Sequence, residues 1–187
     1  TSFARRVNTT FLIASSYLNT AFENINEVNN LLKSAREASP EELVVNSKRK
    51  ESESTLEMID VDTNEKIELD IKLADAWYSS ATLTRERPFA YLILPGNSAI
   101  VDRLTTLGIT TTPLAAAKEL TVQRYVISEY KQAPEKYEDV YRQDVSADTE
   151  LITRNFPEGT SIVYMDQQRS GLIAEVLEPE AANSFIC

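Results

Sequence analysis

The chain has 187 residues, of which 42% are hydrophobic and 26% are charged, as is ordinary for a globular protein with a real core. Its formal net charge of −10 disfavours binding to nucleic acid, because phosphate backbones repel an acidic surface. A single cysteine, Cys187, excludes an intrachain disulfide, and no apolar run approaches the roughly 18 residues of a membrane span. We therefore expect a folded protein with no nucleic-acid partner and no membrane span.

Apolar residues recur every three or four positions over the first part of the chain, which is the spacing of an amphipathic α-helix. The stripe consists of Phe3, Val7, Phe11, Ala14, Leu18, Phe22, Ile25, Val28 and Leu32. A straight helix over residues 3–37 would be about 52 Å long at ~1.5 Å per residue, so we expect either a break among the asparagines at 24–30 or a protruding helix. Ser39-Pro40 ends the pattern. This places a helical segment at residues 1–38 and a second domain at 39–187.

The apolar stripe has two possible uses. It can pack on the sheet of its own chain, or it can dock on a domain absent from this sequence, with Phe11, Leu18 and Phe22 as the docking candidates. The chain does not begin with Met and enters the helical pattern at once, so we expect it to be part of a longer protein.

The period changes to that of β-strands after residue 55. Residues 56–61 predict one strand, and the strict alternation of 67–73 predicts another, joined by the hairpin turn Asp62-Thr63-Asn64-Glu65. The basic group Lys48-Arg49-Lys50 is interpreted as a solvated loop. The apolar run 91–94, the turn Pro95-Gly96 and an apolar face from Ile100 to Leu107 predict a strand-turn-helix unit that Gly108 ends, with a strand near Ile109.

The last third predicts mostly strands. The candidates are 120–130, 139–145, 150–156 and 160–165, and Gly159 supplies the positive φ of the turn before the last of them. A short helix over 172–177 ends at Pro179. The predicted fold class is therefore α+β: a long N-terminal amphipathic helix, followed by a mostly antiparallel or mixed β domain with one strand-turn-helix unit.

The sequence contains no histidine, which excludes Ser-His-Asp and Cys-His nucleophiles and histidine ligands for zinc. Two acidic pairs, Asp144 with Asp148 and Glu178 with Glu180, match in type the paired carboxylates of glycosidases, but acids are abundant enough for such pairs to arise by chance. Trp77 and Tyr78 are possible binding aromatics for a sugar or peptide, although a core or interface position is the more common use of such residues.

Motifs along the chain resemble the accessory C-terminal region of bacterial M14-type zinc carboxypeptidases. They are Arg5-Arg6-Val7, Arg87-Pro88-Phe89-Ala90-Tyr91-Leu92-Ile93, Leu104 to Ile109, Pro157-Glu158-Gly159-Thr160, Gln167, and Leu177-Glu178-Pro179-Glu180 to Ser184-Phe185. In that family the zinc ligands are two histidines and a glutamate, and a second glutamate is the general acid/base. The resemblance implies that all of these would lie before Thr1, so this chain carries no catalytic or metal-binding residue and the zinc belongs to the parent protein.

The resemblance further implies a non-catalytic domain that packs on an upstream peptidase domain of the same polypeptide and shapes its cleft, in a secreted or periplasmic protein. Two alternatives stay open: an extracellular peptide- or glycan-binding module that uses Trp77, and a histidine-free enzyme that uses paired carboxylates. In the tail we expect Leu172, Ile173, Val176, Leu177 and Phe185 to be buried, and we expect Glu178 and Glu180 to be cap or surface residues.

Overall fold

The structure is a computed structural model that describes residues 2–185, and Cys187 therefore lies outside the described residues. The chain divides into two compact units, Thr1–Pro40 and Glu41–Cys187. Each unit is described by itself.

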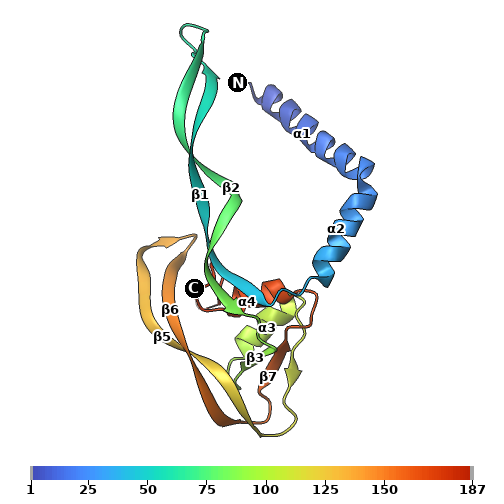
Figure 1. Ribbon diagram of the computed structural model, residues 1–187, viewed down its shortest axis with the longest axis vertical. Helices are drawn as coiled ribbons and strands as arrows, with labels where there is room; N and C mark the ends of the chain where they lie inside the picture. Colours follow the sequence, from blue (N-terminus) through green and yellow to red (C-terminus); the bar gives the residue numbers. More distant parts are fainter. Residues whose placement is uncertain (1, 186–187) are drawn as a thin grey trace. The chain divides into compact units, whose positions relative to one another are not determined.

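The first unit consists of two helices that meet at Asn24 (Figure 1). Helix α1 spans Phe3–Glu23 and α2 spans Ile25–Glu37. Ser2 caps α1 by accepting a hydrogen bond from a backbone N–H of the first turn. The side chain of Asn24 donates to the carbonyl oxygen four residues earlier, at 2.8 Å. Asparagine competes in this way with the helical backbone, which explains why the stripe divides at the first of the asparagines.

The second unit opens with a long antiparallel hairpin of β1, Glu42–Ile59, and β2, Lys66–Glu86. Its turn is held by Asp60, whose carboxylate accepts hydrogen bonds from the backbone N–H groups of Asp62 at 2.8 Å and Thr63 at 3.3 Å. The predicted hairpin is confirmed. The interpretation of residues 48–50 as a loop is wrong, because they lie inside β1 with exposed side chains, where solvation on both faces removes any apolar alternation.

The hairpin contains a large irregularity in β2. Arg49 pairs with Ser79, whereas Lys50 pairs with Asp75, so residues 76–78 have no partner in β1. Such a β-bulge bends a ribbon and re-aims the side chains that it carries.

A second long hairpin joins β5, Lys118–Tyr137, to β6, Val140–Phe156. Its two turn residues, Glu138 and Asp139, have φ of 50° and 66°, as a two-residue hairpin loop requires. The predicted strands are longer than expected: β5 runs on to Tyr137, and the candidates 139–145 and 150–156 form one continuous strand.

A small sheet and two helices complete the second unit. The strands are β3, Ala90–Ile93, β4, Thr112–Pro113, and β7, Ser161–Tyr164; the helices are α3, Ser98–Thr106, and α4, Ser170–Leu177. Strand β7 lies between β3 and β4 and is antiparallel to both, so β3 and β4 are parallel and α3 connects them. This confirms the predicted strand-turn-helix unit. Gly96, Gly108 and Gly159 all have positive φ, at 96°, 72° and 79°.

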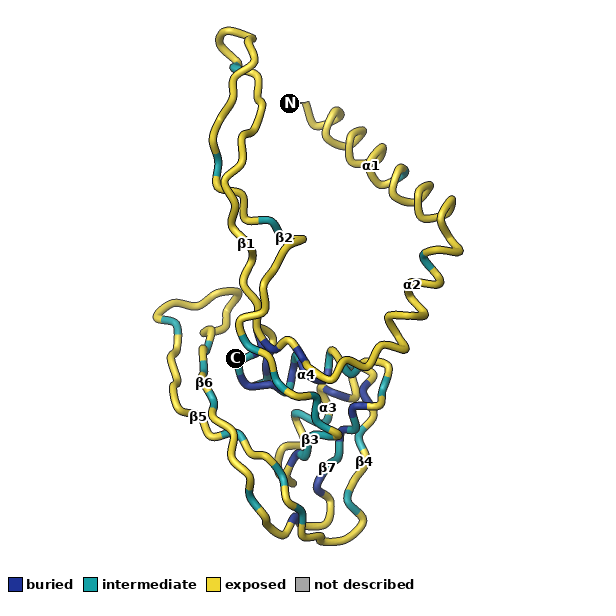
Figure 2. Tube along the Cα trace, in the orientation of Figure 1, coloured by how far each residue is buried: buried dark blue, intermediate teal, exposed yellow. Residues whose placement is uncertain are grey.

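The core lies between the small sheet, α3, α4 and the first residues of β1 (Figure 2). Its buried members are Leu43, Ile93, Leu104, Ile109, Val163, Met165, Ile173, Ala174 and Val176. Leu172, Leu177 and Phe185 pack against them, and the backbone N–H of Phe185 donates to the carbonyl oxygen of Val176 at 2.9 Å. The expected burial of the tail is confirmed for Ile173 and Val176, whereas Leu172, Leu177 and Phe185 are only partly buried.

The predicted fold class is wrong. We expected an α+β domain behind one long helix, but strands make up 46% of the structure and helices 28%, with four helices in the described part of the chain. The chain is β-rich because two hairpins extend far beyond the segments with clear alternation. Among the described residues, no helix is long and apolar enough to cross a bilayer.

Candidate functional site

Five polar side chains from distant parts of the second unit meet at the end of α4. We call this group the carboxylate cluster; it consists of Arg85, Tyr91, Tyr125, Glu178 and Glu180. Helix α4 ends at Leu177, and Pro179 prevents its continuation, so the chain turns out of the helix at Glu178. That turn brings both glutamates inward to groups on β2, β3 and β5.

Glu178 is the centre of the cluster, and its side chain is only 1% exposed. The hydroxyl of Tyr125 lies 2.8 Å from each of its carboxylate oxygens, and Tyr91 donates a hydrogen bond to Oε1. The Nε atom of Arg85 lies 3.1 Å from Oε2 as an ion-pair contact, although its N–H does not point at that oxygen in hydrogen-bond geometry. A buried carboxylate is stable only with such a set of partners.

Glu180 forms the second half of the cluster. Its carboxylate accepts a hydrogen bond from Nη2 of Arg85 and another from the backbone N–H of Ala147 in β6, at 2.9 Å. Its backbone carbonyl accepts from the side chain of Asn46 in β1, at 3.0 Å. Arg85 also stacks over the ring of Tyr125, with 5.1 Å from the guanidinium carbon to the ring centre. The segment after α4 is thus tied to both hairpins.

The environment of the cluster fixes its protonation. Burial raises the pKa of Tyr91 far above its ordinary value, and the hydrogen bond to Glu178 raises it further. Burial and the negative charge of Glu178 likewise raise the pKa of Tyr125. Burial alone lowers the pKa of Arg85, but the hydrogen bond and charge of Glu180 outweigh this effect and the pKa is raised. Both phenols therefore stay neutral donors and the guanidinium stays charged.

This arrangement suits an anchor better than a catalyst. Every carboxylate oxygen of the two glutamates contacts a donor of the protein, and the phenols hold their protons, so a substrate would meet no free acid or base there. Asp144 and Asp148 are four residues apart along β6, about 13 Å at ~3.3 Å per residue, which is wider than the paired-carboxylate reaction needs.

The expectation that Glu178 and Glu180 are cap or surface residues is wrong. Their partners come from positions 85, 91, 125 and 147, and no local pattern in the sequence connects these positions to the tail. Burial of these acids requires a cation and hydrogen-bond donors, and all of them come from distant parts of the chain.

A groove adjoins the cluster where the first half of β6 faces the segment after α4. It has a cavity volume of about 800 Å³, and its lining includes Tyr137, Tyr141 and the segment 179–184. Glu180 lines this groove, so the anchor of the tail is also part of its wall.

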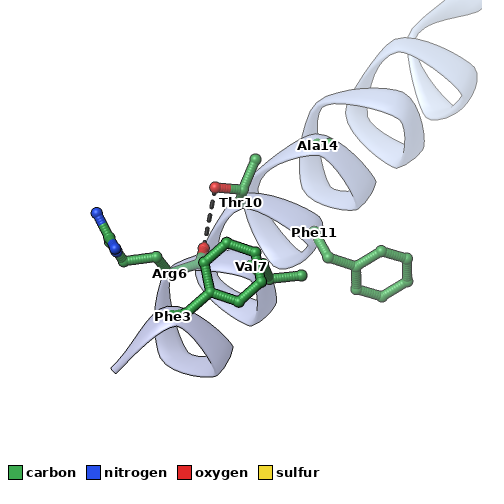
Figure 3. Close-up of a pocket in the computed structure, with 6 residues that line it drawn as sticks. All are labelled: Phe3, Arg6, Val7, Thr10, Phe11 and Ala14. Carbon is green, nitrogen blue, oxygen red and sulfur yellow. Dashed lines mark hydrogen bonds between the residues drawn. The ribbon is translucent and has the colours of Figure 1, made fainter. Parts of the chain in front are cut away.

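The predicted docking residues lie on α1. Phe11 is 66% exposed, Leu18 72% and Phe22 79%. A shallow hollow of about 520 Å³ runs along the first three turns of the helix, lined by the side chains of six residues of α1 alone (Figure 3). The helix therefore presents a continuous apolar face.

The two predicted binding aromatics lie in the bulge of β2. Trp77 is 92% exposed and Tyr78 66%. The backbone N–H of Trp77 donates to the carboxylate of Asp75 at 2.8 Å, which fixes the local backbone of the bulge. Among the described residues of the second unit, no hydrogen bond or ion pair joins these aromatics to the carboxylate cluster.

The described residues include no set of ligands that suits zinc. The chain lacks histidine, and among residues 2–185 no three Cys, Asp or Glu side chains are grouped closely enough to hold a metal ion. The zinc that the carboxypeptidase resemblance implies does not fit the residues of this chain.

Comparison with known proteins shows that the chain is similar to a segment of carboxypeptidases. The chain is 30% identical over 188 residues to carboxypeptidase 2 of Trichophyton tonsurans and of Trichophyton rubrum, matches that cover 98% of this chain and 35% of each relative. The probable carboxypeptidase 2 of Arthroderma benhamiae is 30% identical over 181 residues, 94% of this chain and 34% of that protein. No family model and no solved structure matches the chain.

The chain thus resembles a segment of carboxypeptidase 2 and spans about a third of the length of the curated relatives that it matches. The expected resemblance to a carboxypeptidase is confirmed at this level. The expected bacterial source of that resemblance is wrong, because these relatives are fungal. The matched segment is consistent with a part of the carboxypeptidase outside its core and with a further domain in the same polypeptide.

Proposed function

We propose that this chain is a non-catalytic accessory domain of an M14-type zinc carboxypeptidase, and that it packs on the peptidase domain of the same polypeptide and shapes its cleft. One observation carries the proposal: the relatives match this chain over nearly its whole length, yet about two thirds of their own length lies outside the match. The absence of histidine supports a non-catalytic role for this chain, because the zinc ligands of such an enzyme would then belong to the peptidase domain.

The zinc would be held entirely by the peptidase domain. This chain would contribute surface and rigidity, and its carboxylate cluster would keep the β-rich unit closed while that unit lies against the partner. We place the parent protein outside the cell, as the resemblance to the zinc carboxypeptidases implies.

The docking face that we assign is the apolar stripe of α1. Phe11 and Leu18 are seven residues apart, which puts them on one side of the helix two turns from each other, and both are exposed. A solvated stripe of large apolar side chains marks an interaction surface.

A binding titration tests the proposal. The proposed peptidase domain is expressed separately. It is titrated with this chain, with Phe11→Asp/Leu18→Asp, and with the control Thr9→Asp/Ser16→Asp, which has the same spacing and charge on the opposite side of α1. At about 1.5–3 kcal/mol per large side chain buried, the first pair of changes should weaken binding by two decades or more. The control should bind like the wild-type chain. Equal binding by both variants, with intact circular dichroism, would contradict the assigned face.

A second candidate function is supported by Trp77. An almost fully exposed tryptophan next to Tyr78 in a strand bulge provides an aromatic platform of the kind that binds a sugar ring or a peptide side chain. Quenching of Trp77 fluorescence by soluble oligosaccharides or peptides, lost in Trp77→Ala, would favour this reading. If neither oligosaccharides nor peptides quench the fluorescence, the binding function is contradicted and the accessory role remains as the proposed function.

A further inference from the structure

The outer part of the β1–β2 hairpin has two chemically different faces. Residues directly opposite each other in an antiparallel pair share a face, and Leu56 lies opposite Leu69 while Met58 lies opposite Ile67. Ile71 and Leu73 continue the same face opposite two serines. We call these residues the ribbon face: Leu56, Met58, Ile67, Leu69, Ile71 and Leu73.

The other face of the ribbon is charged and has its own partners. Glu57 lies opposite Glu68 on it, and Lys66 forms an ion pair with Glu57 at 2.6 Å. Thr55 donates to the carboxylate of Asp70 at 3.1 Å across the strands. Five acids against two lysines leave this face net negative, so it is suited to water.

No other element in the described part of the second unit covers the ribbon face. Five of its six side chains are between 37% and 46% exposed. A two-stranded hairpin is at best marginally stable by itself, and an apolar face on such a ribbon adds stability only when a further surface covers it. The ribbon face therefore has the apolar composition that is typical of one side of a protein–protein interface.

We propose that the ribbon face is a second docking surface, and that its occupant is the peptidase domain of the same polypeptide; this inference rests on the proposed function. The relatives provide the occupant, because about two thirds of their length lies outside the matched segment. The net charge of −10 opposes a second copy of this chain as the occupant. The partner surface would be a flat apolar patch, and a net positive charge on that domain would favour its approach to this acidic chain.

The test uses two opposing pairs that are neighbours on the hairpin and point to opposite faces. Leu56→Ser/Leu69→Ser removes the centre of the ribbon face, and Glu57→Gln/Glu68→Gln is the matched control on the charged face. Each variant is titrated against the separately expressed peptidase domain of the proposed function. We expect the first to bind about a hundredfold more weakly or worse and the second to bind within threefold of the wild-type chain.

Amide hydrogen exchange shows whether each variant is still folded. The buried core residues all lie outside the outer ribbon, so substitutions in the ribbon should leave the exchange of core amides unchanged. Core amides such as those of Val163 and Ile173 should exchange as slowly in both variants as in the wild-type chain. In the wild-type complex, addition of the partner should slow exchange at residues 52–58 and 67–73.

Three outcomes would overturn the inference. Unchanged binding by the Leu56/Leu69 variant, while the Phe11/Leu18 variant binds weakly, would refute the ribbon face and leave the proposed function standing. A dimer of the wild-type chain in sedimentation that the Leu56/Leu69 variant dissociates would make a second copy the occupant. No binding by the wild-type chain would refute the proposed function and the inference together.

Discussion

The hydroxyl of Tyr125 lies 2.8 Å from both carboxylate oxygens of Glu178, although 53 residues separate the two in the chain. The contact joins the middle of β5 to the end of α4. It satisfies a carboxylate that is almost completely buried, and a lost donor there leaves part of that charge without compensation.

Tyr125→Phe should therefore lower the free energy of unfolding by about 1–3 kcal/mol. Tyr130→Phe is the control, because Tyr130 lies on the same strand with its side chain 55% exposed, and its loss should stay within about 0.5 kcal/mol. Urea melts followed by circular dichroism measure both. Equal effects of the two substitutions would contradict the role of the cluster as an anchor.

The free energy of unfolding should fall at alkaline pH because the phenols of Tyr91 and Tyr125 are buried. The pKa values of Tyr91 and Tyr125 are raised in the folded state, above the ordinary value of 10.0. A group with a raised folded pKa contributes its stability fully below the unfolded pKa and loses it as the pH rises toward the folded pKa. Urea midpoints should therefore be insensitive to these two groups below about pH 9 and decline above pH 10. The slope of that decline should be smaller in Tyr91→Phe/Tyr125→Phe, and an identical slope would contradict their burial.

The core around α4 should dominate the stability of the second unit. Ile173 is completely buried, and Ile173→Ala should cost about 2–5 kcal/mol through lost burial and the cavity left behind. Leu151→Ala on β6, where the side chain is 73% exposed, should cost less than about 0.5 kcal/mol. Thermal melts of the two variants decide between this ranking and its reverse.

Two glycines should respond to alanine in opposite directions. Gly108 has a φ of 72°, and a Cβ there would lie 2.9 Å from Nη1 of Arg169, which donates to the carbonyl of Leu107. Gly108→Ala should cost about 1–2 kcal/mol. Gly171 lies in α4 with open space around its Cβ position, so Gly171→Ala should add about 0.4–1 kcal/mol. A stabilised Gly108→Ala protein would contradict the strained backbone at this position.

Local sequence patterns predicted the elements that have one buried side and one solvated side. The alternation at 67–73 and the apolar spacing in the tail helix each reflect one buried or solvated side, and each element formed where expected. The lengths of the hairpins could not be predicted in this way, because residues such as Lys48 and Arg49 are solvated on both faces of β1 and leave no period.

The carboxylate cluster also lay beyond reach of local patterns. Nothing near Glu178 in the sequence indicates burial, since its compensation comes from Arg85, Tyr91 and Tyr125. The same reasoning missed Glu180, whose ion pair with Arg85 turns an expected surface acid into a partly buried one. The docking residues Phe11, Leu18 and Phe22 stay predictions, as do Trp77 and Tyr78.

Glu178 follows Arg85, Tyr91 and Tyr125 in the chain, and this order determines how the second unit can assemble during synthesis. Tyr91 is made 87 residues before the carboxylate that it contacts, and Arg85 earlier still. Until the tail has left the ribosome, Arg85 has no counter-ion to accompany it into the interior and must stay in water. The hairpins can form early as local structures, but the unit closes only when the tail arrives, and such dependence on long-range contacts makes folding slow. The buried charges of the cluster can therefore be compensated only after Glu178 and Glu180 have been added.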